Sequence, residues 1–403
     1  MADKSFLNWP FFGPEHREWA ERLHAWSETA LDSLVEAEHE AGHDDEKLDR
    51  VARGMVSALG EAGFLKAAVP GEYGGLVDGR LDVRTLCISR DLLARRSGLA
   101  DFCFAMQGLG TGPVTLFGTE EQKARILPKV ASGEHVAAFA ISESDAGSDP
   151  ASMTTEARLD GDSYRIDGQK TWISHAGLAD HYVVFARTGE APGAKGLSAF
   201  FVPGDSAGLS VSERIAVSAP HPLGTLEFDG CRVSAENRLG QPGEGFKIAM
   251  ATLDVFRSTV GAAALGFARR AFDEAIDFAE QRRLSGTALA DFQLTQDRLA
   301  DMFVAIDTSA LLIARSAWTK DTTGARVTRE ASMAKLHATE TAQQVIDKAQ
   351  QMLGGRGVVF DSLLERLSRE LRPLRIYEGA SEVQKLILAR QARALRSEQR
   401  GES

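Results

Sequence analysis

The sequence has little cysteine and no excess of positive charge, and each shortage excludes a class of protein. Three cysteines among 403 residues, far apart and without a Cys-x-x-Cys pair, argue against a disulfide scaffold and a cysteine-based zinc site. Lys and Arg total 46 against 57 Asp and Glu, which gives a net charge of −11. Nucleic acids and anionic lipids need basic surfaces, so we expect neither nucleic-acid nor membrane partners.

Long apolar runs and a leader segment are also missing. No uninterrupted apolar run approaches the ~18–20 residues that span a bilayer. The N-terminus shows no basic stretch followed by an apolar one, so we expect a cytoplasmic protein. What is present is an ordinary globular composition, with 43% hydrophobic and 26% charged residues. At ~150 residues per domain, this length predicts two or three domains.

The periodicity of apolar residues changes twice along the chain. Residues 1–13 are aromatic and broken by Pro10 and Gly13, which predicts a non-helical arm packed on the body. From about residue 15 to 134, apolar residues recur three and four apart, as in amphipathic helices. A capping box at residues 119–122 precedes a predicted helix over 123–130. The first 134 residues therefore form a predicted helical domain.

Short β-prone runs follow, and then long helices. Strands are predicted over 135–141, 163–167, 181–187, 197–202 and 224–228, with hairpin turns at 160–162 and 167–168. Helices are predicted over 246–282, 293–320, 328–352 and 380–396, with a polar loop over 282–291. Helices of this length indicate a bundle. The predicted fold class is α+β multidomain, with a helical domain (1–134), a middle β-domain (135–240) and a helical bundle (241–403).

Two motifs carry weak functional signals. Gly108, Gly110 and Gly112 suggest a dinucleotide loop, but they follow a helical run and lack the sixth-position glycine, so we do not favour a Rossmann site. His39 and His43 are four residues apart and could share a helix face, yet a solvated acidic face explains them better than a metal site. We predict no bound metal.

Three segments carry stronger signals. Residues 139–149 form a strand that ends in hydroxyls and exposed amides, which can bind a carbonyl-rich ring or a phosphate, or form a plain turn. In residues 170–174, Trp172 can cover a planar cofactor or fill a core. The glycine cluster of 351–357 permits close approach of a ligand or another backbone. Glu378 is a candidate general base, or else a charge at a helix N-terminus.

These segments, in this order along an α–β–α chain, resemble the acyl-CoA dehydrogenase family of flavoproteins over residues 15–396. The resemblance implies an N-terminal helical domain, a middle β-barrel-like domain and a C-terminal four-helix bundle. It implies FAD between the β-domain and the bundle. It also implies a homotetramer, or a homodimer, in which a neighbouring subunit completes each FAD site.

The resemblance also implies roles for individual residues, with Glu378 as the catalytic base. Some family branches place the base one residue before the arginine that matches Arg257, but that position here is Phe256, which cannot take a proton. The implied FAD contacts run from the β-domain to the bundle: Phe139, Ser142, Ser148, Trp172, Ser174, Arg282, Gln293, Gln351, Gly354, Gly355, Ala380 and Glu382. The implied substrate contacts are Ser148, Asp254, Arg257, Tyr377 and Gly379.

Within this set, Trp172 would pack on the flavin ring, Ser174 and Ser142 would bond its edge, and Arg282 would reach the FAD of a neighbouring subunit. Several positions depart from the family pattern, among them Ser144, where proline is common, and Arg356, where asparagine or tyrosine often stands. Serine replaces threonine at 142 and 174, which keeps the hydroxyl. Ser285 replaces a phenylalanine and Ala380 a threonine, and each change removes a contact near FAD.

The implied reaction converts an acyl-CoA to a 2,3-enoyl-CoA. Glu378 takes the α-proton while the β-hydride passes to flavin N5, and an electron-transfer flavoprotein accepts the electrons. The apolar, bulky helix over 100–107 should line the acyl end and favour a short, branched or alicyclic group. A flavoprotein oxidase or monooxygenase of the same fold, and a non-catalytic homologue that acts as a binding protein, stay open. An acyl carrier protein in place of CoA also stays open.

Overall fold

The structure is a computed structural model that describes residues 4–400. Its elements run from helices through a sheet to long helices, as the predicted fold class requires. The described residues group into two compact units. Within the described residues, the bundle unit comprises 4–25, 83–98 and 257–400, and the sheet unit comprises Trp26–Asp82 and Leu99–Phe256. This grouping does not follow the domain limits at 134 and 240, which stay a prediction.

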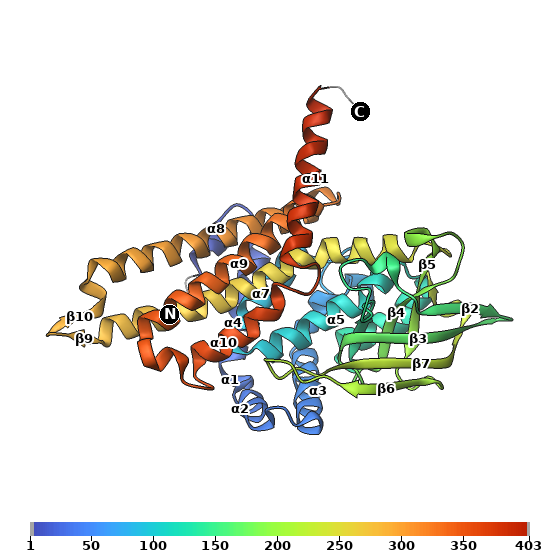
Figure 1. The fold of residues 1–403 in the computed structure, drawn as a ribbon, viewed down its shortest axis with the longest axis horizontal. Coiled ribbons are helices and arrows are strands. Elements are labelled where there is room, and N and C mark those ends of the chain that lie inside the picture. Colours follow the sequence, from blue (N-terminus) through green and yellow to red (C-terminus); the bar gives the residue numbers. More distant parts are fainter. Residues whose placement is uncertain (1–3, 401–403) are drawn as a thin grey trace. The chain divides into compact units, whose positions relative to one another are not determined.

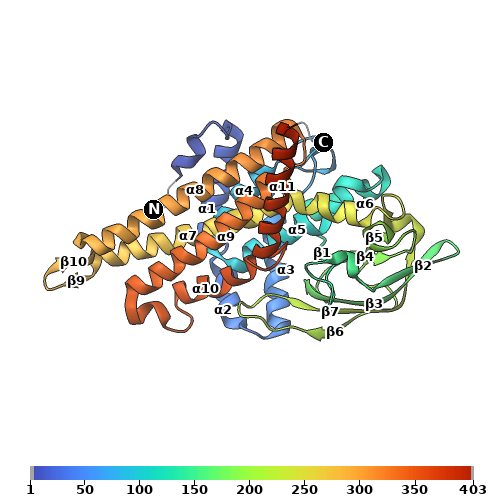
Figure 2. The same cartoon turned by 45° about the horizontal axis from the view of Figure 1, so that its top comes forward.

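Long helices dominate the bundle unit. Three of the predicted helices appear with nearly the predicted limits, while α11 runs four residues further. α8 and α9 lie side by side in both cartoon views (Figures 1 and 2). The helix α10 was not predicted. The bounds are α7 (Gly245–Gln281, which begins in the sheet unit), α8 (Gln293–Thr323), α9 (Thr328–Leu353), α10 (Leu363–Leu374) and α11 (Ser381–Arg400).

The N-terminal arm packs on the bundle unit, and one prediction about it was wrong. Residues 5–8 form a 3₁₀ turn, η1 (Ser5–Asn8), in which Leu7 N donates to the Lys4 carbonyl and Trp9 N to the Phe6 carbonyl, both at 3.0 Å. The arm is therefore not free of helix, contrary to the prediction from the sequence. Phe6 and Leu7 are buried. The Arg269 guanidinium lies 4.4 Å from the centre of the Phe6 ring. The unit also contains α4 (Val83–Arg96) and most of α1 (Pro14–Ala30).

The sheet unit contains its own short helices. The capping box is confirmed, because Gln122 N donates to Thr119 Oγ1 at 3.2 Å and Thr119 N donates to Gln122 Oε1 at 2.8 Å. The helix it starts begins at Glu120, three residues before the predicted start. The bounds are α2 (Asp32–Ala41), α3 (Asp45–Glu61), η2 (Phe64–Ala68), η3 (Gly71–Tyr73), α5 (Gly98–Phe117) and α6 (Glu120–Ala131).

An eight-stranded sheet has the order β6-β7-β3-β2-β4-β5-β8, with β1 pairing in parallel with β4. The predicted hairpin turn at 160–162 is confirmed, since Asp160 pairs with Ser163. The strands β2, β6 and β8 were not predicted. The bounds are β1 (Ala137–Ala140), β2 (Glu156–Asp160), β3 (Ser163–Ser174), β4 (His181–Arg187), β5 (Leu197–Pro203), β6 (Leu209–Arg214), β7 (Leu223–Ser234) and β8 (Arg238–Leu239).

The predicted turn at 167–168 was wrong, because both residues lie inside β3. Gly168 has a φ of 138°, and the β3–β7 register shifts between Ile166 and Gly168. A Cβ at Gly168 would lie 2.8 Å from Thr155 Cα. The glycine therefore permits a close approach of two backbones within the sheet and does not reverse the chain.

The three glycines of the Gly-x-Gly-x-Gly motif lie inside α5, where they make room for neighbours. A Cβ at Gly108 would lie 2.6 Å from a ring carbon of Phe256, and one at Gly112 would lie 2.7 Å from Thr252 Cγ2. A Cβ at Gly110 would lie 2.7 Å from Ala138 N of β1. The motif is thus a packing notch on a helix and not the strand-to-helix loop of a dinucleotide site.

By length and composition, the helix α7 could cross a membrane. The sequence did not predict this, because only uninterrupted apolar runs were considered. However, 89% of its apolar window is buried inside the structure. Its alanine-rich stretch, including Ala262, Ala263 and Ala264, is fully buried. We therefore interpret α7 as a core helix.

Candidate active site in two halves

Trp172 leaves the core of the sheet unit through an irregularity in β3. Lys170 pairs with Leu226 of β7 and Ile173 with Gly224, so β3 has one extra residue in this stretch. Such a bulge redirects side chains. Trp172 accordingly adopts a φ of 61° and leaves 57% of its side chain exposed, while both flanking residues are buried. Trp172 is therefore not a core residue, and its indole is accessible to a planar ligand.

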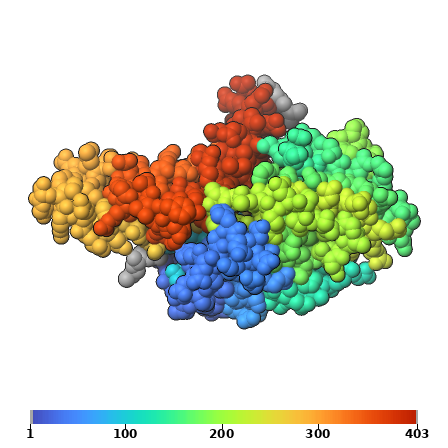
Figure 3. Space-filling model, turned by 60° about the horizontal axis from the view of Figure 1, so that its bottom comes forward, coloured from blue at the N-terminus to red at the C-terminus, as the bar shows by residue number. Residues whose placement is uncertain are grey.

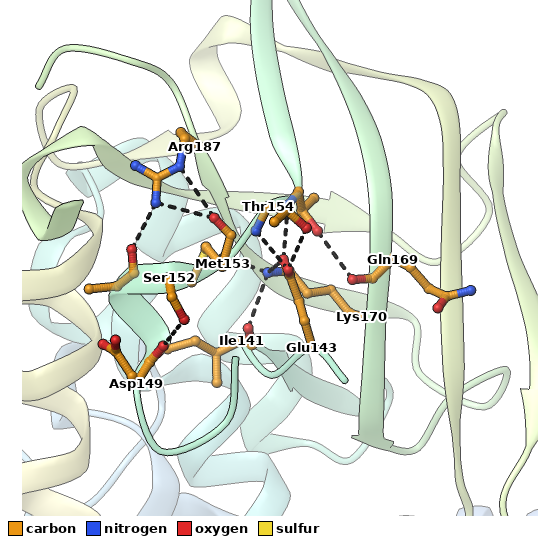
Figure 4. Close-up of polar contacts among 11 residues, drawn as sticks. Ile141, Glu143, Asp149, Ser152, Met153, Thr154, Gln169, Lys170 and Arg187 are labelled. Atoms are coloured by element: carbon orange, nitrogen blue, oxygen red, sulfur yellow. Dashed lines mark hydrogen bonds and ion pairs between the residues drawn. The ribbon is translucent and has the colours of Figure 1, made fainter. Parts of the chain in front are cut away.

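The loop that carries Ser142 is fixed beside this bulge by a buried ion pair (Figure 4). Lys170 Nζ donates to Glu143 Oε1 at 2.8 Å and to the Ile141 carbonyl at 3.1 Å. Glu143 also accepts hydrogen bonds from the backbone N–H of Thr154, at 2.7 Å, and of Thr155, at 3.0 Å. These contacts hold the end of β1 against the strand that carries Trp172.

The charges of this cluster are compensated internally. Burial alone would raise the pKa of Glu143, but the charge of Lys170 and the hydrogen bonds from Lys170, Thr155 and Thr154 together lower it. The backbone adds one more tie, because Thr171 N donates to the Ser142 carbonyl at 3.0 Å. This hydrogen bond ties Ser142 to Thr171, the residue directly before Trp172.

The remaining predicted residues of the sheet unit differ in their exposure. Ser148 is exposed on a loop that Arg187 anchors at its far end, by donating to the Ala151 carbonyl at 2.8 Å (Figure 4). Ser174 is half-buried at the end of β3. Phe139 is buried against Phe185, with ring centres 5.0 Å apart, so a contact with a cofactor would have to use its backbone.

Glu378 lies in the bundle unit, on the link between α10 and α11. Its φ is 52° and that of Gly379 is 94°, so two consecutive residues adopt the left-handed conformation. Non-glycine residues hold this conformation only where their surroundings impose it. Here Arg257 Nε donates to the Glu378 carbonyl at 3.3 Å, and Gln384 Nε2 donates to the Gly379 carbonyl at 2.9 Å. The turn therefore fixes the position of the Glu378 side chain.

The ends of the same link are tied to Glu340 of α9. Arg375 forms two hydrogen bonds with its carboxylate, at 3.0 and 2.6 Å, and Ser381 Oγ forms a third. Burial alone would raise the pKa of Glu340, but the bonds from Arg375 and Ser381 lower it overall. Tyr377 is exposed at the link, and Glu382 is exposed at the start of α11. Glu378 is thus half-buried on a backbone turn that is held at both ends, and it is not a solvated charge at a helix end.

Asp254 and Arg257 lie three residues apart on α7, which places them on one face of the helix. Both are buried. The hydrogen bond from the Arg257 side chain to the Glu378 carbonyl joins a predicted substrate contact to the predicted base. Phe256, between them, is buried over the glycine notch of α5.

The other predicted FAD contacts gather at the opposite end of the bundle unit. The loop predicted over 282–291 forms a small hairpin there, with strands β9 (Arg283–Leu284) and β10 (Thr287–Ala288) (Figure 1). The Arg356 guanidinium lies 6.0 Å from the ring of Phe278, which places the glycine cluster beside the end of α7. The exposed residues at this end are Arg282, Gln293, Gln351, Gly354 and Gly355.

This second group is far from Glu378 within one chain. Arg257 and Arg282 are 25 positions apart along α7 and its last turn, and a helix rises ~1.5 Å per residue, so about 38 Å separates them. Arg257 contacts Glu378 directly. Of the predicted bundle residues, the structure therefore brings Arg257, Glu378 and Gly379 together and leaves Arg282 with the distant group.

The exposed positions fit a flavin dinucleotide. A Cβ at Gly354 or Gly355 would have nothing within 4 Å, so the backbone there is open to a ligand. An accessible indole can stack on a planar ring, and an exposed guanidinium such as Arg282 suits a pyrophosphate. Among the described residues, no group of three or more His, Cys, Asp or Glu could hold a metal ion.

Comparison with known proteins agrees with this layout. Acyl-CoA dehydrogenase family models match residues 13–134 (N-terminal domain), 138–231 (middle domain) and 243–393 (C-terminal domain). The mitochondrial short-chain specific acyl-CoA dehydrogenase of Sus scrofa is 38% identical over 348 residues, which are 85% of this chain and 83% of that protein.

Solved structures are similar over almost the whole chain. Butyryl-CoA dehydrogenase from Megasphaera elsdenii has a TM-score of 0.87 and 30% identity, over 94% of this chain and 98% of that one. A prolyl acyl carrier protein oxidase has a TM-score of 0.84 and 28% identity, over 94% and 99%.

The family models, the relative and the solved structures together identify an oxidoreductase with a flavoprotein fold. The chain belongs to the acyl-CoA dehydrogenase family, whose members are flavoproteins. The roles of its individual site residues stay predictions.

Several residues that shape the site were missed from the sequence. Glu143 and Lys170 lie inside the segments 139–149 and 170–174, but their separation of 27 residues gives no sign of an ion pair. Lys335 and Gln384 contact the base turn and were not singled out. One signal was available for Lys335: it falls on the small-residue face of α9, with Ala331 and Ala338, where a lysine is unexpected.

Proposed function

We propose that the protein catalyses the flavin-dependent α,β-dehydrogenation of an acyl-CoA thioester, with Glu378 as the base. The held, left-handed turn at Glu378 is the observation that carries this proposal, because a base must be positioned within hydrogen-bond reach of the proton that it removes. Glu378 takes the α-proton of the substrate, and the product is a 2,3-enoyl-CoA.

The chain's other residues bind and orient. Asp254 and Arg257 would hold the CoA arm, with Ser148 and Tyr377 along the substrate. Trp172, Ser142 and Ser174 would hold the ring of FAD, which supplies the acceptor for the hydride from the β-carbon when bound. An electron-transfer flavoprotein would then take up the two electrons, and similarity to an electron-transferring flavoprotein structure from Acidaminococcus fermentans, at 32% identity, supports this class of partner.

We propose a homotetramer or homodimer whose subunits complete each other's FAD sites. The separation of about 38 Å between Arg257 and Arg282 supports it, since one chain cannot bring both to a single flavin. The surface of α11 supports it too. Only Ser381 and Gln384 of its 20 residues are buried, while Leu386 is 58% exposed. In Figures 1 and 3, α11 (dark red) projects beyond the other helices of the bundle unit.

We propose a short, branched or alicyclic acyl group, as the apolar residues of α5 suggest. The helix places Cys103 against the Ala52 carbonyl and Phe102 against the rings of His175 and His221. A substrate panel decides this point. A highest kcat/KM on a long straight-chain acyl-CoA would overturn the proposed preference.

Anaerobic titration with butyryl-CoA and isobutyryl-CoA tests the reaction. The wild-type protein should lose its flavin absorbance, and Glu378→Gln should bind FAD and ligand but keep the absorbance unchanged. Glu398→Gln, a change on the exposed face of α11, serves as the matched control and should behave as the wild type. Bleaching of Glu378→Gln at the wild-type rate would overturn the assignment of the base.

An oxidase acting on a carrier-bound acyl group is the second candidate, favoured by the similarity to a prolyl acyl carrier protein oxidase. Rapid reoxidation of the substrate-reduced protein by air would support it over the dehydrogenase. A purified protein that is colourless and cannot take up FAD would instead support a non-catalytic homologue.

A further inference from the structure

The turn at Glu378 and Gly379 has a third donor besides Arg257 and Gln384. Lys335 of α9 is completely buried, and its Nζ donates to the Gly379 carbonyl at 2.9 Å. A buried ammonium group is costly unless its hydrogen bonds and its charge are matched. Its presence at this turn therefore needs an explanation beyond packing.

Hydrogen bonding alone does not explain a lysine here. Gln384 Nε2 already donates to the same carbonyl at 2.9 Å, and it approaches the Glu378 carbonyl at 3.4 Å. A neutral donor can therefore serve this turn, and it does so at lower desolvation cost. What Lys335 adds is a positive charge.

The charged groups around Lys335 come from every element near the turn. Glu378 of the α10–α11 link, Glu340 of α9 and Glu382 of α11 act on it as negative charges, and Arg257 of α7 acts as a positive one. Glu340 is already engaged by Arg375 and Ser381, and Glu382 is exposed. Glu378 directly precedes Gly379, whose carbonyl Lys335 binds, so it is the remaining carboxylate of the three that the buried ammonium can serve.

We propose that Lys335 is a positioning residue for Glu378, which fixes the left-handed turn through the Gly379 carbonyl and whose positive charge keeps the Glu378 carboxylate ionised and ready to accept a proton. The proposal rests on Glu378 being the base. It extends the proposed function by assigning a role to a residue outside the substrate and flavin contacts.

The two parts of this role separate with pH. Burial lowers the pKa of Lys335 from 10.5 to about 8, although Glu378 opposes the shift. Above that pH the neutral amine still donates to the Gly379 carbonyl, so the turn keeps its hydrogen bond but loses the charge. A fall of kcat/KM on the alkaline side, near pH 8, would report the charge and not the fold. Arg in place of Lys keeps its charge throughout the alkaline range and should remove that limb.

The test compares three variants with the wild type, using butyryl-CoA as the probe. Lys335→Met removes donor and charge and should lower kcat/KM by about 100-fold, mainly through kcat, because the base is misplaced and less ionised. Its acid limb should move to higher pH, because the nearby positive charge is gone. Lys335→Arg should restore much of kcat/KM and extend it to higher pH. Lys348→Met is the matched control on α9, where Lys348 pairs with Asp301 at 2.6 Å, and should match the wild type.

A second measurement does not depend on turnover. Hydrogen exchange of the peptide over residues 375–381, followed by mass spectrometry on the purified holoenzyme, should be faster in Lys335→Met than in the wild type and Lys348→Met. If Lys335→Met does not fold, the alkaline limb of Lys335→Arg decides, and an unchanged limb refutes the proposal.

Failure of this proposal is distinguishable from failure of the proposed function. An inactive Glu378→Gln beside a Lys335→Met variant with wild-type kcat/KM and pH profile would overturn the role of Lys335 alone. An active Glu378→Gln would overturn both. Slower turnover of Lys335→Met with an unchanged pH profile would reduce Lys335 to a structural residue.

Discussion

Gly108→Ala tests the packing notch that replaces the expected dinucleotide loop. The substitution puts a methyl group 2.6 Å from Cε1 and 3.0 Å from Cζ of Phe256, whereas carbon atoms pack best at ~3.5–4.0 Å. The Phe256 ring is only 3% exposed, so it cannot swing into solvent. Either the ring or the α5 backbone must move.

The sign of the effect follows from two opposed terms. Alanine is better than glycine inside a helix by about 1 kcal/mol. An overlap of about 1 Å in a packed core is expected to cost about 2–3 kcal/mol, the upper part of the range for overpacking. The net destabilisation should therefore be about 1–2 kcal/mol, which is opposite in sign to the helix propensity.

Urea unfolding followed by circular dichroism measures this, with Gly54→Ala as the matched control. Gly54 lies inside α3, and its Cβ would meet only the end of the flexible Leu34 side chain, at 3.2 Å, so that variant should be neutral or more stable. Phe256→Leu frees space beside residue 108, and the double variant should lose less stability than the sum of the two single ones. A Gly108→Ala protein as stable as the wild type, or additive behaviour, would refute the notch.

Two further predictions concern buried ionisable side chains of the sheet unit. Lys170→Met leaves the Glu143 carboxylate buried without its counter-charge and should lower the free energy of unfolding in urea by about 3–5 kcal/mol. Lys170→Met combined with Glu143→Leu should cost less than Lys170→Met alone. A loss below about 1 kcal/mol in the single variant would show that the ion pair does not stabilise the fold. Burial lowers the pKa of His181 from 6.5 to about 3, so the neutral ring contributes stability that is present above pH 6.5 and lost as the pH falls toward 3. His181→Phe should therefore shift acid unfolding to lower pH, and an unchanged midpoint by circular dichroism would contradict this account.

Periodicity predicted the long helices because each buries a continuous apolar or small-residue face. It failed for β6, an edge strand of the sheet, since the apolar alternation there covers only four residues and no residue of the strand is buried. It also failed for α10, although this segment of 12 residues is strongly amphipathic; Pro373, a poor helix former, lies in its last turn. The missed strand β8 lies at the other end of the strand order and has only two residues.

The candidate site was predictable in its residue types and not in its geometry. A tryptophan beside a hydroxyl and a glutamate beside a glycine are visible in the sequence. The bulge that exposes Trp172 arises from pairing with β7, more than 50 residues away. The donors to the Glu378 turn come from α7, α9 and α11. Contacts of this range leave no local pattern, which is why Lys335 was overlooked.

Trp172 of the sheet unit and Glu378 of the bundle unit share a backbone feature. Both adopt the left-handed conformation, with φ of 61° and 52°, although neither is a glycine. This conformation is unfavourable for such residues, so the surroundings must impose it. At Trp172 the bulge in β3, next to the buried Lys170, imposes the left-handed conformation. At Glu378 it is imposed by the side chains that donate to the Glu378 and Gly379 carbonyls.

In both places a completely buried lysine adjoins the unusual residue. Lys170 precedes Trp172 by two positions, and Lys335 holds the carbonyl that follows Glu378. Burying an ammonium group costs stability, so a fold selected for stability alone would use apolar residues at both sites. The lysines are better explained by the fixed backbone geometry that they support. Apolar substitutions that preserve the fold should therefore affect ligand binding and turnover more than the overall structure.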